Sequence, residues 1–184
     1  IAGLSPAFLF STQQIRTSRG NLVATNIGNQ TIEEIRNMKF DDVGLLGGNP
    51  AGTIEPVRTV VEDNRTFTVN TYIAWVENSG SVGGFMPAWD YKEVRITVIS
   101  DDPMGGGSSV YKEVSTLIAR DASQPLLTGS HLRVSVFRGW GRTETESVPQ
   151  PNVKVGINGN STWLYSGSKG TALFVGLPQG TYTV

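Results

Sequence analysis

The sequence contains no cysteine and only one histidine, His131, among its 184 residues. Without thiols the chain has no disulfide bridge, no iron–sulfur or thiolate zinc site and no cysteine nucleophile. One imidazole does not supply the ligands of a usual transition-metal site, and Ser/His/Asp catalysis would have to use His131. The sequence therefore predicts a protein that is not an enzyme and that needs no metal or cofactor.

Charge is sparse and balanced. Fifteen Lys and Arg residues against sixteen Asp and Glu residues give a net charge of −1, and the basic residues form no run. Nucleic-acid binding depends on concentrated positive charge. We therefore expect no nucleic-acid partner.

Long apolar runs are also missing. Residues 1–15 are uncharged, but a membrane-spanning helix needs about 20 apolar residues. A signal peptide would show a basic start and a small-residue cleavage site, and neither is present. The chain also stops within an alternating stretch at Val184. We expect further sequence before Ile1 and after Val184.

A helix is predicted over about residues 7–40. No proline occurs from Ala7 to Lys39. Apolar positions there recur at steps of three and four, the period of one helical face: Ala24, Ile27, Thr31, Ile35 and Met38. Such a helix is about 50 Å long, more than a domain of this size covers. Part of it should protrude or meet another partner.

Alternating strand patterns follow the helix. They cover residues 67–75, 94–98 and 110–118. An amphipathic helix and a sheet with one apolar face each need the other. We expect an antiparallel sheet over about residues 53–120, packed on the second half of the helix. Together they form a first domain, residues 1–127.

Short strands then follow a Ser-, Pro- and Gly-containing stretch at residues 122–129. Turn residues separate them, which is typical of a small β-sandwich: 132–136, 153–157, 163–165, 171–175 and 181–184. The sequence predicts a second domain at residues 128–184. The expected fold class is α+β, with a long N-terminal helix on an antiparallel sheet followed by a small all-β sandwich.

Two acidic pairs are the only candidates for a cation site. Asp41 with Asp42, and Asp101 with Asp102, offer carboxylate oxygens of the kind that calcium binds. Neither pair lies in a spaced acidic loop. We interpret both as turn residues and expect no metal site.

Two stretches resemble a known family. Residues 26–44 read NIGNQTIEEIRNMKFDDVG, and residues 90–98 read DYKEVRITV. They are similar to the helix end and the following paired strands of minor pilins and type II secretion pseudopilins, within the type IV pilin family. The resemblance covers about residues 1–120. It implies a helix that is held in a membrane before assembly and then packs among copies of itself.

The family's processing site and its apolar opening with a glutamate at the fifth mature position are not in this sequence. The resemblance implies that Ile1 lies about twenty residues inside the mature helix and that Pro6 matches the helix-kinking proline. Residues 148–155 and 170–184 resemble a second group, the collagen-adhesin B-type and carboxypeptidase regulatory-like sandwiches. A sandwich of this kind would serve lateral contacts or adhesion.

The combined expectation is a structural subunit of a bacterial extracellular filament similar to a type IV pilus. Its partners would be identical subunits or other pilins. The alternatives are a secreted or surface-attached adhesin that forms no filament, and a secretion pseudopilin. The residues expected to pack helices in the filament are Leu4, Pro6, Phe8, Leu9, Phe10 and Ile15. Those expected to dock the head onto its own helix are Ile27, Ile35 and Met38.

Overall fold

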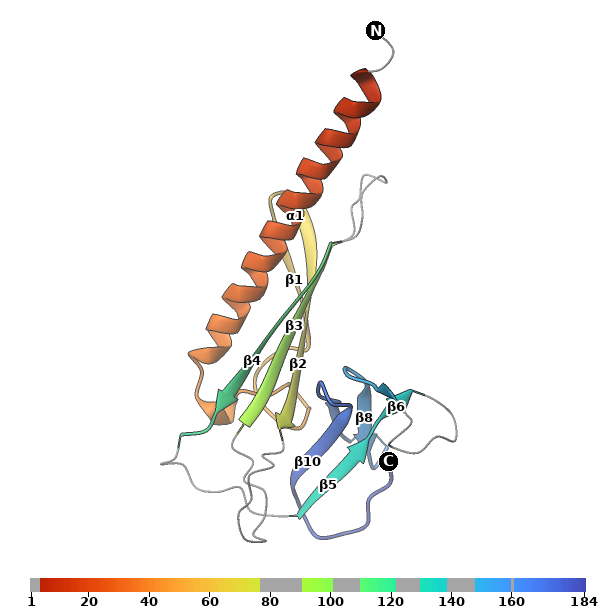
Figure 1. Ribbon diagram of the computed structural model, residues 1–184. Helices are drawn as coiled ribbons and strands as arrows, with labels where there is room; N and C mark the ends of the chain where they lie inside the picture. The colour runs from red at the N-terminus through yellow and green to blue at the C-terminus, as the bar shows by residue number, and fades with distance from the viewer. Residues whose placement is uncertain (1–3, 77–90, 101–109, 122–129, 139–147, 160) are drawn as a thin grey trace. The chain divides into compact units, whose positions relative to one another are not determined.

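The computed structural model describes residues 4–76, 91–100, 110–121, 130–138, 148–159 and 161–184 (Figure 1). One α-helix comes first, and strands fill most of the remaining described chain. The elements in chain order are α1 (Leu4–Arg36), the 3-10 helix η1 (Phe40–Asp42), β1 (Val57–Glu62), β2 (Arg65–Val76), β3 (Tyr91–Ser100), β4 (Val110–Ala119), β5 (Ser130–Ser135), β6 (Phe137–Arg138), β7 (Val148–Pro149), β8 (Lys154–Ile157), β9 (Thr162–Tyr165) and β10 (Thr171–Leu177).

The predicted fold class is wrong. Among the described residues the protein is mostly β, with one α-helix and a four-stranded antiparallel sheet, and they show no sandwich. The predicted strands at 67–75, 94–98 and 110–118 are confirmed within β2, β3 and β4. Their alternation of apolar and polar residues indicated the strands correctly, but the expectation of a second domain built as a sandwich misjudged the class.

Helix α1 ends four residues before the predicted position. Pro6 lies in its first turn, where backbone N–H groups have no partner within the helix. At the other end Lys39 is extended, with φ −65° and ψ 143°, and Phe40 starts a separate 3-10 turn. The carbonyls of Phe40 and Val43 accept hydrogen bonds from the Lys92 side chain. A long-range contact therefore holds this turn in a conformation that the α-helical period does not anticipate.

The main sheet has the strand order β1-β2-β3-β4, in which every strand neighbours the next one in the chain. β1 and β2 pair in unbroken register from Val57 opposite Asn70 to Glu62 opposite Arg65. Asp63 and Asn64 close this hairpin with φ of 50° and 57°. Positive φ at both central residues is the geometry of a tight two-residue hairpin turn.

The C-terminal strands form three two-stranded sheets: β5 with β10, β6 with β7, and β8 with β9. The predicted strand at 181–184 is wrong, because these residues are in no strand. Thr183 instead accepts a hydrogen bond from the Asn158 backbone N–H at 2.9 Å. The alternation of apolar and polar residues indicates which side chains of a strand are buried, but it does not indicate which other strand pairs with it. The prediction of a sandwich was wrong for this reason.

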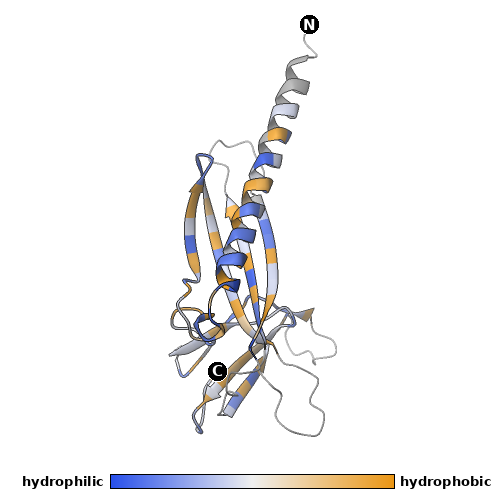
Figure 2. Cartoon of the chain, turned by 90° about the vertical axis from the view of Figure 1, so that its left-hand side faces the viewer, coloured by the Kyte–Doolittle hydropathy of each residue, from blue (hydrophilic) through white to orange (hydrophobic). Residues whose placement is uncertain are grey.

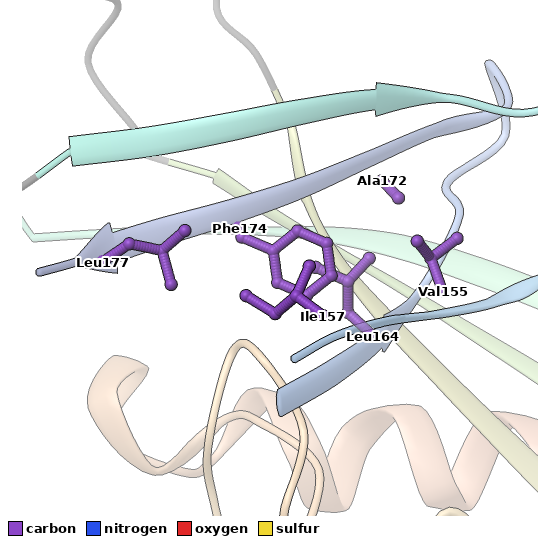
Figure 3. Close-up of a cluster of buried hydrophobic side chains, with 6 residues drawn as sticks. All are labelled: Val155, Ile157, Leu164, Ala172, Phe174 and Leu177. Atoms are coloured by element: carbon purple, nitrogen blue, oxygen red, sulfur yellow. The ribbon is translucent and has the colours of Figure 1, made fainter. Parts of the chain in front are cut away.

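The chain divides into two compact units. Unit 1 comprises residues 1–35, 57–71 and 95–115, and unit 2 comprises residues 36–56, 72–94 and 116–184. The predicted domain boundary at 127/128 lies outside the described residues. One core of unit 2 gathers apolar side chains from β8, β9 and β10 (Figure 3): Val155, Ile157, Leu164, Ala172, Phe174 and Leu177.

Candidate functional site

One face of α1 exposes two large apolar side chains. Ile15 is 65% exposed and Leu22 is 62% exposed. Seven residues, or two helical turns, separate them, so they lie on the same face of the helix. Exposed polar residues share this face, and we call the whole row the outward face: Ile15, Ser18, Leu22, Asn26 and Asn29. From Ile15 to Asn29 the row contains no charged residue, and the exposed Glu33 follows four residues later on the same face.

The opposite face of α1 is buried within unit 1. Its members recur at helical spacing: Val23, Ala24, Ile27, Thr31, Ile32 and Ile35. Gly28 lies among them, and a Cβ atom added there would be 2.5 Å from Cγ2 of Val114 and 3.7 Å from Cγ2 of Val98. The helix backbone therefore lies close to β3 and β4, at a distance that a side chain at position 28 would not permit.

The buried face covers only part of the helix. Among residues 11–19, every side chain that the structure describes is exposed or half-exposed, and burial begins at Gly20. At 1.5 Å per residue, the helix before Gly20 is about 24 Å long. Figure 1 shows these turns of α1 extending past the ends of β1 and β2, and Figure 2 shows a hydrophobic band on that extension. The described side chains of residues 11–19 thus lack the cover that the sheet gives to the C-terminal half of α1.

Two ion pairs link α1 to the β1–β2 hairpin. Nε of Arg19 is 3.0 Å from Oδ2 of Asp63, in the hairpin turn. Nη2 of Arg58 donates to Oε2 of Glu34 at 3.2 Å and to the hydroxyl of Thr31 at 2.7 Å. All four charged side chains are at least 39% exposed. Each pair fixes a charge at the margin of the helix–sheet contact.

The structure places the residues predicted from the sequence on different faces. Ile15 lies on the outward face, whereas Ile27 and Ile35 lie on the buried face. Met38 follows the helix end and is half-buried. The side chains of five predicted packing residues lie outside the described part of the chain: Leu4, Pro6, Phe8, Leu9 and Phe10.

A second cluster surrounds Lys92, which is only 2% exposed. Its ammonium donates to the carbonyls of Phe40 and Val43, both at 2.6 Å. It also lies over the rings of Phe40, 4.3 Å from the centroid, and Trp75, 4.9 Å from the centroid. Charge-assisted bonds and ring contacts of this kind hold a cation firmly.

Burial lowers the pKa of Lys92 to about 8, and the charges of Asp41 and Asp42 oppose this shift. A lysine with a lowered pKa is a candidate for a nucleophile or a base. Here the amine already binds two backbone carbonyls and is closed off from solvent. We therefore interpret Lys92 as a structural residue whose hydrogen bonds fix the turn after α1, and we call these contacts the Lys92 clasp. The acidic residues Asp41 and Asp42 act as its counter-charges.

Asn49 joins distant segments of unit 2. Its Oδ1 accepts from the indole Nε1 of Trp75 at 2.9 Å, and its Nδ2 donates to the carbonyl of Val175 at 3.2 Å. Its backbone N–H donates to the carbonyl of Trp163 at 2.7 Å. One loop residue thereby ties β2, β9 and β10 together, which is again a structural role.

Partly buried rings gather near the same loop. Tyr72 and Tyr165 contact edge to face with centroids 4.9 Å apart, and Trp163 contacts Tyr165 in the same way at 5.6 Å. Burial raises the pKa of Tyr165, and the neighbouring Tyr72 raises it further. Tyr165 is therefore not an acid or base near neutral pH.

No group of three or more potential metal ligands occurs among the described residues. His131 is exposed in β5, Asp41 and Asp42 lie in η1, and Asp101 and Asp102 lie outside the described residues. In the part of the chain that is described, neither helix combines the length and the apolarity that a membrane crossing requires.

No protein-family model, curated protein or solved structure matches the chain. The sequence-based prediction named Ile15 but not Leu22, which is also exposed and which the seven-residue spacing from Ile15 could have indicated. It also missed Arg19, Asp63 and Lys92, whose partners are distant in sequence and leave no local pattern.

Proposed function

We propose that this protein is a non-enzymatic structural subunit that assembles side by side with other subunits into an extracellular filament through helix α1. The observation that carries the proposal is the outward face, where Ile15 and Leu22 are both more than half exposed. The protein's own sheet occupies the opposite face of the helix. A neighbouring subunit could therefore pack on α1 without displacing any contact described within the chain.

The energetics favour such packing. Burying an exposed Ile or Leu side chain contributes about 1.5–3 kcal/mol, and the contact recurs at every subunit of a polymer. Most of the stability of a helix in a protein comes from tertiary packing of one face and not from helix propensity. Neighbouring subunits would supply the cover that the segment before Gly20 lacks within unit 1.

The cellular setting in the proposal comes from the sequence resemblance to type IV pilins. It adds a bacterial cell surface as the location, identical subunits or other pilins as partners, and a membrane-held stage before assembly. Unit 2 would then be available for lateral contacts or adhesion. These parts of the proposal depend on the resemblance, whereas the helix contact depends on the exposure of Ile15 and Leu22.

Electron microscopy of sheared surface material from cells that produce the protein tests the proposal. Antibody labelling should place the chain along fibres in the wild type. Ile15→Asp and Leu22→Asp should abolish the fibres while leaving the thermal unfolding of the subunit unchanged. Val61→Asp is the matched control, because Val61 is 71% exposed and strand alternation places it on the opposite side of β1 from Arg58, which contacts the helix. Unlabelled fibres, or fibres that tolerate both helix substitutions, would contradict the proposal.

Limited proteolysis gives a second test that requires no fibre. The proposal predicts that isolated subunits are cleaved near Arg16 or Arg19 and leave a stable remainder. A monodisperse monomer whose first fifteen residues resist protease would favour the alternative, an adhesin or binding module that does not polymerise.

A further inference from the structure

One positive charge lies next to the outward face. Arg19 is four residues after Ile15 and three before Leu22, and residues at these spacings are neighbours on a helix surface. An arginine side chain at this position that had no partner would be free to place its guanidinium over Ile15 and Leu22. The structure shows it restrained, because its Nε lies 3.0 Å from Oδ2 of Asp63.

The hairpin turn positions Asp63 for this contact. Asp63 and Asn64 adopt positive φ, and Glu62 pairs with Arg65 across the end of the hairpin. This two-residue turn holds the carboxylate at the side of α1. The carboxylate neutralises the guanidinium and keeps it at the hairpin, away from the row formed by Ile15 and Leu22.

We propose that the Arg19–Asp63 ion pair is a specificity device that keeps the apolar part of the outward face, Ile15 and Leu22, uncharged for a second copy of this chain. The inference rests on the proposed assembly through α1 and deepens it, because it names the partner and the residues that admit it. Two copies bring two Arg19 side chains to one contact. Unpaired like charges at an apolar contact are unfavourable, both by repulsion and by loss of hydration.

The order of residues along the outward face fits a second copy in parallel orientation. The row runs from apolar residues, Ile15 and Leu22, to amide residues, Asn26 and Asn29. When two such helices lie parallel, apolar side chains meet apolar ones and amides meet amides, which can hydrogen-bond to each other. A shift of seven residues still places Ile15 beside Leu22.

The ion pair contributes little to folding. The side chain of Arg19 is 71% exposed and that of Asp63 is 40% exposed. Exposed pairs of this kind typically stabilise a protein only weakly. Substituting either residue should therefore leave the subunit folded, so that a change in association can be measured on an intact protein.

The decisive experiment compares self-association of four proteins by sedimentation equilibrium: wild type, Asp63→Asn, Arg19→Gln and the double variant. Asp63→Asn frees the charge of Arg19 and should weaken association about tenfold or more. Arg19→Gln removes the charge and should associate at least as tightly as the wild type, as should the double variant. Glu34→Gln, which opens the other ion pair of α1, is the matched control and should change nothing.

Salt dependence provides a second readout. Added salt screens a freed Arg19, so the defect of Asp63→Asn should shrink at high ionic strength, whereas the wild type should change little. The chain has no cysteine, so a single Leu22→Cys substitution allows a direct test of proximity. Under oxidation the Leu22→Cys protein should form a disulfide-linked dimer, both by itself and in a mixture with the Asn29→Cys protein. The Val61→Cys protein, as the control, should not form a dimer.

An ion pair that only supports the fold would make Asp63→Asn and Arg19→Gln equally harmful, and that result would overturn the inference. Unchanged association of Asp63→Asn, or a wild type that stays monomeric at high concentration, would also overturn it. Fibres on cells that carry Asp63→Asn in normal amounts would reject the role of the ion pair alone. Fibres that tolerate Leu22→Asp would reject the proposed function itself.

Discussion

Each unit of this protein buries an apolar core, but unit 2 also depends on polar contacts between residues far apart in sequence. In unit 1, α1 buries a row of apolar residues and brings Gly28 close to Val114 and Val98. In unit 2, buried polar groups bind backbone carbonyls far away in sequence. Lys92 binds the turn after α1, and Asn49 binds β10. The first kind of contact depends on area and fit, and the second depends on direction.

The difference explains which contacts leave surface available to a partner. Apolar packing uses one face of a helix and leaves the other face exposed, as with Ile15 and Leu22. Polar side chains such as Lys92 and Asn49 instead form hydrogen bonds with individual backbone carbonyls and so fix loops in one conformation. Unit 1 therefore leaves one face of α1 exposed, whereas the described polar cluster of unit 2 is closed off from solvent. If the two kinds of contact differ in this way, substitutions in them should change the free energy of unfolding by different amounts and for different reasons.

The largest expected effect lies in unit 1. Ile27→Ala removes a buried side chain and should lower the free energy of unfolding by about 2–5 kcal/mol. Leu22→Ala, on the outward face of the same helix, should change it by no more than about 0.5 kcal/mol. Urea unfolding of the monomer measures both values. Equal losses would show that the two faces of α1 do not differ in cover.

Much of unit 1 could be predicted from the sequence, because its contacts obey a period. The three- and four-residue spacing of Ile27, Thr31 and Ile35 indicated the buried helix face, and the two-residue alternation indicated β2 and β3. The protruding length of the helix also followed from simple arithmetic. Spacing reports which side chains share a face, and a face is what helix–sheet packing buries.

The rest could not be predicted, because it depends on single directional contacts. The sequence around Phe40 has no pattern that predicts the hydrogen bond between its carbonyl and Lys92, which is fifty-two residues away. The partner of Arg19 lies forty-four residues away, in a turn. The alternation of apolar and polar residues also does not predict which of the strands β5 to β10 pair with each other. The helix end, the ion pair at the outward face and the pairing of the C-terminal strands were therefore all found only in the structure.

The Lys92 clasp predicts an unusual pH dependence for unit 2. The pKa of Lys92 is about 8 in the folded protein and 10.5 for an unperturbed lysine. Between these values the unfolded chain keeps a proton that the folded chain has lost, so folding becomes more favourable as pH rises. The gain should be on the order of 3 kcal/mol between pH 8 and 10.5. Below pH 8 this gain is absent.

The matched variant for this measurement is Lys92→Met, which has no charge to titrate at the site. Unfolding of both proteins from pH 7 to 10.5 isolates the contribution of Lys92, because all other groups titrate in both. The wild type should gain stability relative to the variant as pH rises. A difference that stays flat, or that falls, would show that the buried amine is not the source.

A smaller effect is expected at Asn49. Asn49→Ala leaves the indole N–H of Trp75 and the carbonyl of Val175 without their partner, which should lower stability by about 1–3 kcal/mol. The fluorescence of Trp75 should shift to longer wavelength as the loop loosens. Asn70→Ala, at a half-exposed position of β2, is the control. An unchanged emission spectrum would indicate that the loop is held by its other contacts.

The smallest effect should come from Gly28→Ala, where two terms oppose each other. The added methyl meets Cγ2 of Val114 at 2.5 Å, which should cost about 1–3 kcal/mol, while alanine gains up to about 1 kcal/mol of helix propensity. A modest net loss is expected. In a Val114→Ala background the collision disappears, so the same substitution should become stabilising. That reversal of sign, measured by urea unfolding of the four proteins, would show that close packing alone demands glycine here.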